Sequence, residues 1–146
     1  MLRFYIKQTD EYERLIEFLK PMGLEFSDEE IKSDEYLKAW KVIQEPDYLV
    51  GCVILSKRAG EYYVSGIGVD MPMRRTGIGK ILMNKLINEV RKMGGERIYL
   101  VAKVPEFFET LGFEKVDPED APAVSKCPEC EQYNVKCYPV IMKKEL

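Results

Sequence analysis

The spacing of apolar residues changes along the chain and predicts a succession of short elements. Residues 2–7 have the pattern of a strand. Apolar residues at helical spacing then predict a helix over 12–19, for which Thr9 or Asp10 can serve as the cap. A serine followed three residues later by a glutamate has the form of a capping box and predicts a second short helix over 27–33.

Alternating apolar and polar residues follow and predict an antiparallel meander. Its three strands are expected over 36–44, 48–57 and 61–69, joined by turns that contain proline or glycine. A helical period then returns over 78–93 and ends at a pair of glycines, before a further strand over 97–102. The strand–helix–strand order predicts that the strands on either side of this helix are parallel neighbours.

The last third of the chain is less regular. We expect a short helix over 105–111, a strand beginning over 113–116 and a final strand over 135–143. Together the elements predict an α+β fold, with a mixed and mostly antiparallel central sheet of about six to seven strands and flanking helices. We expect one domain over 1–146, with a cysteine-containing C-terminal segment over 117–146.

Composition narrows the chemistry. The 146 residues are 46% hydrophobic and 32% charged, which is typical of a globular domain. The net charge of -3 argues against broad nucleic-acid binding, and no apolar run reaches the length that spans a membrane. We therefore expect a cytoplasmic protein without nucleic-acid or membrane partners. The absence of histidine excludes His-based triads, proton shuttles and metal ligation.

The densest chemical signal is a basic, glycine-containing turn between the strand over 61–69 and the helix that follows it. The first N–H groups of a helix lack intrahelical partners and can bind a phosphate, while glycines allow close approach of the backbone. Basic side chains and a threonine hydroxyl would add to such a site. The alternative is a tight turn with a solvated basic face. The residues concerned are Arg74, Arg75, Thr76, Gly77, Ile78, Gly79 and Lys80.

The pattern Arg74-x-x-Gly77-x-Gly79 resembles the pyrophosphate loop of the GNAT superfamily of acetyl-CoA-dependent N-acetyltransferases. Residues 105–113, which read Pro-Glu-Phe-Phe-Glu-Thr-Leu-Gly-Phe, are similar to the second signature of that family. The resemblance covers roughly residues 48–116. The Phe-Phe version of the second signature also resembles the short N-acetylglutamate synthase-like acetyltransferases, whose substrate is a free amino acid.

The resemblance implies a GNAT fold and an acetyl-CoA cleft between two strands, over 61–69 and 97–102, that splay apart. The pantetheine arm of acetyl-CoA would pair with the backbone of the strand over 61–69. A main-chain N–H near the end of that strand would polarise the thioester carbonyl. An amine would attack directly, so we expect Cys52 to be a core residue rather than a nucleophile. Beyond the basic loop, the implied cofactor-binding residues are Ile67, Gly68, Val69, Phe107 and Phe108.

The proton-transfer groups do not follow from the resemblance. Many family members have a tyrosine where this chain has Phe108, and Ser65 and Gly66 stand where an acidic residue is usual. The candidates for a water-linked general base are Glu61, Tyr63 and Tyr99. A substrate carboxylate would need a basic partner, for which the candidates are Arg3, Lys41 and Lys103.

Three cysteines lie near the C-terminus. Cys127, Cys130 and Cys137 have the spacing C-x2-C-x6-C, and thiolates at this spacing can supply three of the four ligands of a structural zinc ion. A fourth ligand is not evident. A disulfide and free thiols are the alternatives to zinc.

The leading hypothesis is an acetyl-CoA-dependent N-acetyltransferase that acts on a small-molecule amine, most plausibly an amino acid. The alternatives are a protein or peptide N-acetyltransferase, and a CoA-binding sensor or assembly module with little catalysis. A homodimer is a further expectation, because dimers are common among proteins that resemble this chain.

Overall fold

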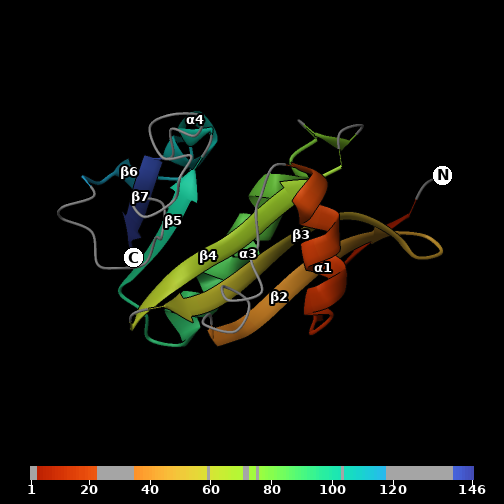
Figure 1. Ribbon diagram of the computed structural model, residues 1–146, viewed down its shortest axis with the longest axis horizontal. Coiled ribbons are helices and arrows are strands. Elements are labelled where there is room, and N and C mark those ends of the chain that lie inside the picture. Colours follow the sequence, from red (N-terminus) through yellow and green to blue (C-terminus); the bar gives the residue numbers. More distant parts are fainter. Residues whose placement is uncertain are drawn as a thin grey trace.

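The computed structural model describes residues 3–22, 35–58, 60–70, 73–74, 76–102, 104–117 and 140–146. In this part of the chain one sheet carries all the strands, with helices packed on it (Figure 1). The elements are β1 (Phe4–Thr9), α1 (Tyr12–Leu19), a 3-10 turn η1 (Lys20–Met22), β2 (Glu35–Gln44), β3 (Tyr48–Arg58), β4 (Glu61–Val69), α3 (Ile78–Lys92), β5 (Arg97–Ala102), α4 (Pro105–Glu109), β6 (Glu114–Lys115) and β7 (Val140–Glu145).

The sheet has seven strands in the order β1-β2-β3-β4-β5-β7-β6. Neighbouring strands are antiparallel except β4 and β5, which are parallel and are connected through α3. The predicted α+β class, the strand number and the parallel neighbours are therefore confirmed.

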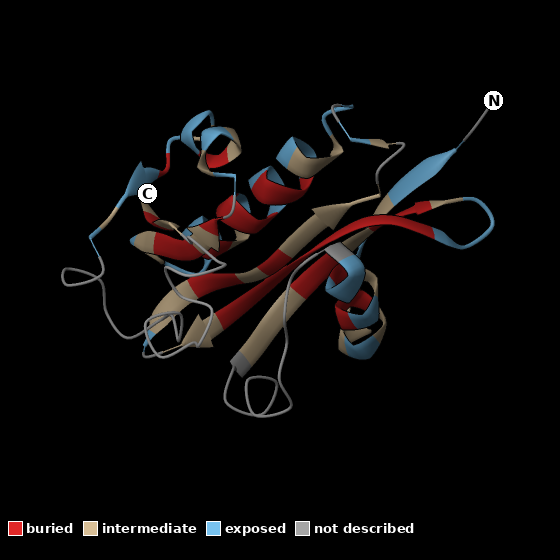
Figure 2. Ribbon diagram, turned by 45° about the horizontal axis from the view of Figure 1, so that its top comes forward, coloured by how far each residue is buried: buried red, intermediate tan, exposed pale blue. Residues whose placement is uncertain are grey.

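Helices cover both faces of the sheet. In Figure 1, α1 lies in front of β3 while α3 lies behind the strands. Each helix has its own apolar cluster. The cluster under α1 includes Leu15, Leu19 and Ile54, and the larger cluster under α3 includes Leu82, Leu86 and other side chains from β2 to β5. Figure 2 shows buried residues running along β2 and β3 and along the inner side of α3. The sheet is thus the middle layer of the fold.

The start of α1 is held by contacts of Thr9 and Glu11, including a hydrogen bond from the Glu11 N–H to the Thr9 hydroxyl at 3.1 Å, and not by a cap from the N-cap side chain. The predicted caps, Thr9 and Asp10, are not the N-cap residue. Glu11 occupies that position without a side-chain cap hydrogen bond. Its carboxylate instead accepts hydrogen bonds from Lys41 on β2 and from the Thr9 hydroxyl. These contacts, with that of Lys41 the strongest, lower the pKa of Glu11 from 4.5 to about 2. The ion pair therefore ties the first turn of α1 to the sheet.

The strand β4 contains an irregularity near its middle. Against β3, Gly66 pairs with Ile54 but Val64 pairs with Leu55, so Ser65 is an extra residue on β4. This is a β-bulge, and a bulge bends and twists its strand. The bulge lies just beyond the last pair between β4 and β5.

Element limits agree closely with the sequence prediction in the centre of the chain and less well towards its end. The observed β4 and β5 have the expected limits, whereas the last strand ends at Glu145 rather than at residue 143, and its predicted first residues, 135–139, lie outside the described residues. The short helix ends at Glu109, followed by a turn in which Gly112 has a φ of 91°. The second helix predicted over 27–33 lies outside the described residues.

Candidate active site

The central feature of the site is an opening between β4 and β5. The two strands form only the pairs Tyr62–Ile98 and Tyr63–Tyr99. Beyond Tyr63, β4 continues through Val69 and β5 continues to Ala102 without further pairing of one with the other among the described residues. In a continuous sheet these backbone groups would be paired. The opening therefore presents polar backbone to a ligand, as the splayed strands of the sequence prediction require.

The turn after β4 is tied to the sheet at several points. The N–H of Asp70 donates to the carbonyl of Val50 at 2.7 Å, and the Tyr48 hydroxyl donates to the Asp70 carboxylate at 2.7 Å. Arg74 donates from Nε to the carbonyl of Val69 at 3.1 Å. That hydrogen bond leaves the other guanidinium N–H groups of this exposed residue for a ligand.

The helix α3 begins at the point where the turn ends. Gly77 is its N-cap residue, has a φ of 90°, and is not accompanied by a side-chain cap hydrogen bond. Residues with side chains rarely adopt this backbone conformation, which accounts for glycine here. The N–H groups of the first turn thus keep their capacity for an anion, and the helix dipole favours negative charge there. Lys80 is exposed on the same turn.

Gly79 brings three elements together. A Cβ atom at this position would lie 3.3 Å from Cζ of Phe107 on α4 and 3.8 Å from Cγ2 of Val69 on β4. The first turn of α3, the end of β4 and the start of α4 therefore meet at a glycine. Phe108, also predicted to bind the cofactor, is only 8% exposed and packs against Phe113 in the core. Of the two phenylalanines, Phe107 is the one beside the loop.

Two of the predicted catalytic candidates lie at the vertex of the opening. Tyr63 and Tyr99 form the last pair of β4 and β5, are each 7% exposed, and pack together with Val101. The guanidinium of Arg58 lies 4.5 Å from the centre of the Tyr63 ring, a cation–π contact that the sequence analysis missed. The predicted antiparallel hairpin of β3 and β4 could have indicated this contact, because it places Arg58 diagonally opposite Tyr63.

The third candidate, Glu61, lies apart from the cofactor loop. It is the first residue of β4, eight residues before Val69, which corresponds to about 26 Å along a strand. Its carboxylate is 3.7 Å from the guanidinium of Arg97 on β5. The structure therefore brings Tyr63 and Tyr99 together and leaves Glu61 at the far end of the strand.

Cys52 lies within the core under α1 and is fully buried. Burial raises the pKa of its thiol to about 12. A thiol with such a pKa carries almost no thiolate at neutral pH, so it is a poor nucleophile. Its position agrees with the predicted role as a core residue.

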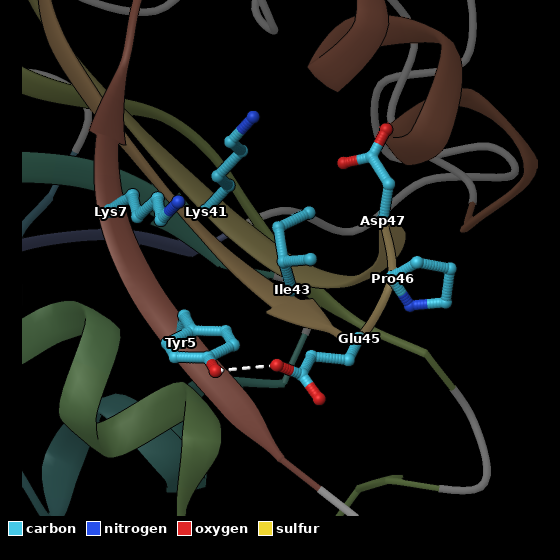
Figure 3. Close-up of a pocket in the computed structure, with 7 residues that line it drawn as sticks. All are labelled: Tyr5, Lys7, Lys41, Ile43, Glu45, Pro46 and Asp47. Carbon is cyan, nitrogen blue, oxygen red and sulfur yellow. Dashed lines mark hydrogen bonds between the residues drawn. The ribbon is translucent and has the colours of Figure 1, made fainter.

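The basic candidates for a substrate carboxylate lie elsewhere. Arg3 is exposed at the start of β1, and Lys103 is outside the described residues. Lys41 is two strands away from β4, about 10 Å, and is paired with Glu11. It lines a cavity of about 470 Å³ near the β2–β3 turn, where the Tyr5 hydroxyl donates to Glu45 at 2.6 Å (Figure 3). This cavity is separate from the opening between β4 and β5.

Several predicted site residues cannot be placed. Arg75 and the three cysteines Cys127, Cys130 and Cys137 lie outside the described residues. Within the described ranges no group of three or more Cys, Asp and Glu side chains could hold a metal ion. The zinc, disulfide and free-thiol readings of the C-terminal cysteines therefore stay predictions.

Comparison with known proteins identifies the family. The sequence profile of the acetyltransferase (GNAT) family matches residues 3–113, while no curated protein matches the chain. Among solved structures, N-acetylglutamate synthase from Neisseria gonorrhoeae, complexed with coenzyme A and N-acetyl-glutamate, superposes with a TM-score of 0.72 at 19% identity. The match covers 99% of this chain and 35% of the synthase, so the chain spans about a third of that protein.

Two shorter proteins match over nearly their whole length. An acetyltransferase of the GNAT family from Staphylococcus aureus Mu50 has a TM-score of 0.70 at 19% identity, with 99% of each chain covered. The ribosomal-protein-S18-alanine N-acetyltransferase from Escherichia coli has a TM-score of 0.71 at 18% identity, covering 98% of this chain and 94% of that one. At these identities the likeness establishes the fold. Within the described residues, no helix has the length and apolar character needed to cross a bilayer.

Proposed function

The chain belongs to the GNAT family of acetyltransferases, and from this premise we propose that it transfers the acetyl group of acetyl-CoA to the primary amine of a small, amino-acid-type molecule. The observation that carries the proposal is the stretch of β4 that does not pair with β5, followed along the chain by the first turn of α3, whose N-cap residue makes no side-chain cap hydrogen bond. The backbone of β4 suits an extended arm that contains amide groups, and the first turn of α3 suits a pyrophosphate.

The residues present fit acetyl-CoA. The N–H groups of the first turn of α3, with Arg74 and Lys80, would hold its phosphates. The absence of a side chain at Gly79 lets Phe107 and Val69 pack closely against the first turn of α3. Backbone groups of β4 between Ile67 and Val69 would pair with the amides of the pantetheine arm. When bound, acetyl-CoA supplies the acetyl group as a reactive thioester.

The protein itself would position the reacting groups and polarise the thioester carbonyl. A backbone N–H near Val69 directed at the thioester oxygen stabilises negative charge as it develops there, which is a preorganised electrostatic contribution. The amine nitrogen attacks the carbonyl carbon directly, and the carbon–sulfur bond then breaks. The excess proton on nitrogen would pass to water ordered by Tyr63 or Tyr99. Because Phe108 has no proton to give, CoA would leave as the thiolate and be protonated by water.

The acceptor is proposed from the resemblance of residues 105–113 to amino-acid acetyltransferases. A structural neighbour bound to N-acetyl-glutamate is in keeping with that proposal, while the neighbour that acetylates ribosomal protein S18 favours a protein N-terminus as the second candidate. We also retain as proposals a single domain, a cytoplasmic location, a homodimer and a structural zinc ion at the C-terminal cysteines.

The first test is calorimetric titration of acetyl-CoA into the purified protein and into Arg74→Ala. Loss of a charge-assisted contact to phosphate predicts an affinity lower by about tenfold in the variant. Arg91→Ala, which removes an exposed arginine at the other end of α3, is the matched control and should bind like the wild type.

Turnover separates the candidate functions. Release of CoA in the presence of free amino acids, and not of peptides, supports the proposed acceptor, whereas turnover with peptides alone favours the protein acetyltransferase. Binding of acetyl-CoA without turnover of any amine would favour a CoA-binding module. If acetyl-CoA does not bind at all, the proposed function is wrong.

A further inference from the structure

One polar side chain is fully buried among the described core residues. Ser56 on β3 has no exposed surface and lies at the end of the apolar part of that strand. Its hydroxyl is hydrogen-bonded to the hydroxyl of Ser65, and its Oγ lies 3.4 Å from the carbonyl oxygen of Tyr63. Burying a hydroxyl is unfavourable unless it finds partners, and here both partners belong to β4.

One of these partners is the irregular residue of β4 and the other lies two residues before it. Ser65 is the extra residue of the β-bulge, and Tyr63 belongs to the last pair between β4 and β5. The next residues include Gly66 and Gly68, which have no side chains that could hold the strand by packing. The hydrogen bonds of Ser56 therefore restrain β4 where its own side chains and its pairing with β5 provide little restraint.

We propose that Ser56 and Ser65 are positioning residues for acetyl transfer: their hydrogen-bonded hydroxyls fix the β4 bulge and so direct a backbone N–H on the open edge of β4, in the stretch from Ile67 to Val69, at the thioester. This inference rests on the proposed function. Neither serine is a catalytic residue here, because both act through the backbone of β4.

The chemistry of the two serines and their place beside the opening favour a positioning role over a purely stabilising one. An alanine at residue 56 would avoid the cost of burying a hydroxyl in the interior. The polar pair occurs instead two residues before the stretch of backbone that the reaction needs. Transition-state stabilisation by fixed dipoles depends strongly on geometry, and a displacement of about 1 Å can lower a rate by about 100-fold.

The test compares Ser56→Ala, Ser65→Ala and Ser65→Thr with the wild type. Ser65 is partly exposed, so the threonine variant has room for its methyl group and retains the hydroxyl. Thr9→Ala is the control. This variant removes a hydroxyl that is hydrogen-bonded to Glu11, and Thr9 lies on the edge strand β1, far from the opening. Each variant is measured for kcat, for KM of acetyl-CoA, for affinity towards CoA and for Tm.

We expect kcat to fall by about 10- to 100-fold in both alanine variants, since a small displacement of the dipoles affects the reacting atoms most. Affinity for CoA, which depends mainly on the phosphate loop, should change by less than about threefold. Ser65→Thr should recover most of the rate. The double alanine variant should lose little more than either single variant, because the two hydroxyls act as one unit.

Any one of the following outcomes would overturn the inference. A Tm that falls while kcat is unchanged would assign the pair to stability alone, and equal losses of CoA affinity and kcat would indicate general damage to the fold. An unimproved rate in Ser65→Thr would exclude the hydroxyl as the cause. If Ser56→Ala does not fold, Ser65→Ala decides the matter by the same criteria. A wild-type protein that transfers no acetyl group would overturn the proposed function as well, whereas wild-type turnover with unaffected variants overturns the positioning role only.

Discussion

At the scale of single residues, Gly79 combines a structural and a chemical requirement. Alanine normally stabilises a helix relative to glycine by about 1 kcal/mol. Here the added Cβ would lie 3.3 Å from the Phe107 ring, so the ring or the first turn of α3 must move slightly. That movement would alter the space in which the phosphates are proposed to bind.

We therefore predict that Gly79→Ala weakens acetyl-CoA binding by about tenfold without lowering Tm, because helix propensity compensates for the crowding. Calorimetry and thermal unfolding measure the two quantities on the same sample. Unchanged affinity in a well-folded variant would mean that the close contact between α3 and α4 is unrelated to the cofactor.

At the scale of elements, the attachment of α1 depends on a surface ion pair with an unusual pH range. Because Lys41 and Thr9 lower the pKa of Glu11 to about 2 from 4.5, the ionised form contributes stability above pH 4.5. That contribution is lost as the pH falls from 4.5 towards 2. The Glu11 side chain is 39% exposed, so salt should screen part of the effect.

The prediction is that Glu11→Gln makes the free energy of unfolding less dependent on pH between 4.5 and 2. Glu13→Gln, on the exposed side of the same turn, is the matched control. Urea denaturation at several pH values gives the two slopes. Identical slopes for the wild type and Glu11→Gln would show that the ion pair does not hold α1 in solution.

At the scale of the whole molecule, α3 belongs to the larger core, and its first turn is also part of the loop that we propose binds phosphate. Leu86 lies in the middle of this helix, is fully buried and packs with side chains of the sheet. Truncating a buried leucine typically costs about 2–5 kcal/mol. This is a large part of the stability of a domain, which is about 5–15 kcal/mol.

We predict a loss of about 2–5 kcal/mol in the free energy of unfolding for Leu86→Ala, measured by urea denaturation. Lys85→Ala on the exposed side of α3 should change it by less than about 0.5 kcal/mol. A small effect of the Leu86 substitution would mean that α3 contributes much less to the core than its burial indicates.

Parts of the fold that depend on neighbouring residues could be predicted from the sequence, whereas parts that depend on residues far apart in the chain could not. The limits of β4 and β5 depend on local alternation and on the glycines beside them, so the sequence predicted both. The splay of these strands came from the family resemblance. The choice between Phe107 and Phe108 depends on the rotation of a five-residue helix against the rest of the fold, which a local pattern does not determine.

The contacts of the site depend still more on long-range register. Ser56 meets Ser65 only because β3 and β4 pair with a bulge between them, and Arg58 reaches Tyr63 through the same hairpin. Serine and arginine at such positions have no distinctive spacing in the sequence. A candidate phosphate loop can be proposed from the sequence because its residues are adjacent, whereas the vertex of the opening is assembled from separate strands.

The short pairing of β4 with β5 also has a consequence for the protein in a living cell. A ligand that bridges the two strands adds its binding free energy to that of folding, in proportion to the logarithm of its concentration. The supply of acetyl-CoA would then set how long each copy of the protein survives unfolding and proteolysis, as well as how fast it works. When acetyl-CoA is scarce, the protein would be less stable and would be degraded faster, so the amount of enzyme would fall together with its substrate.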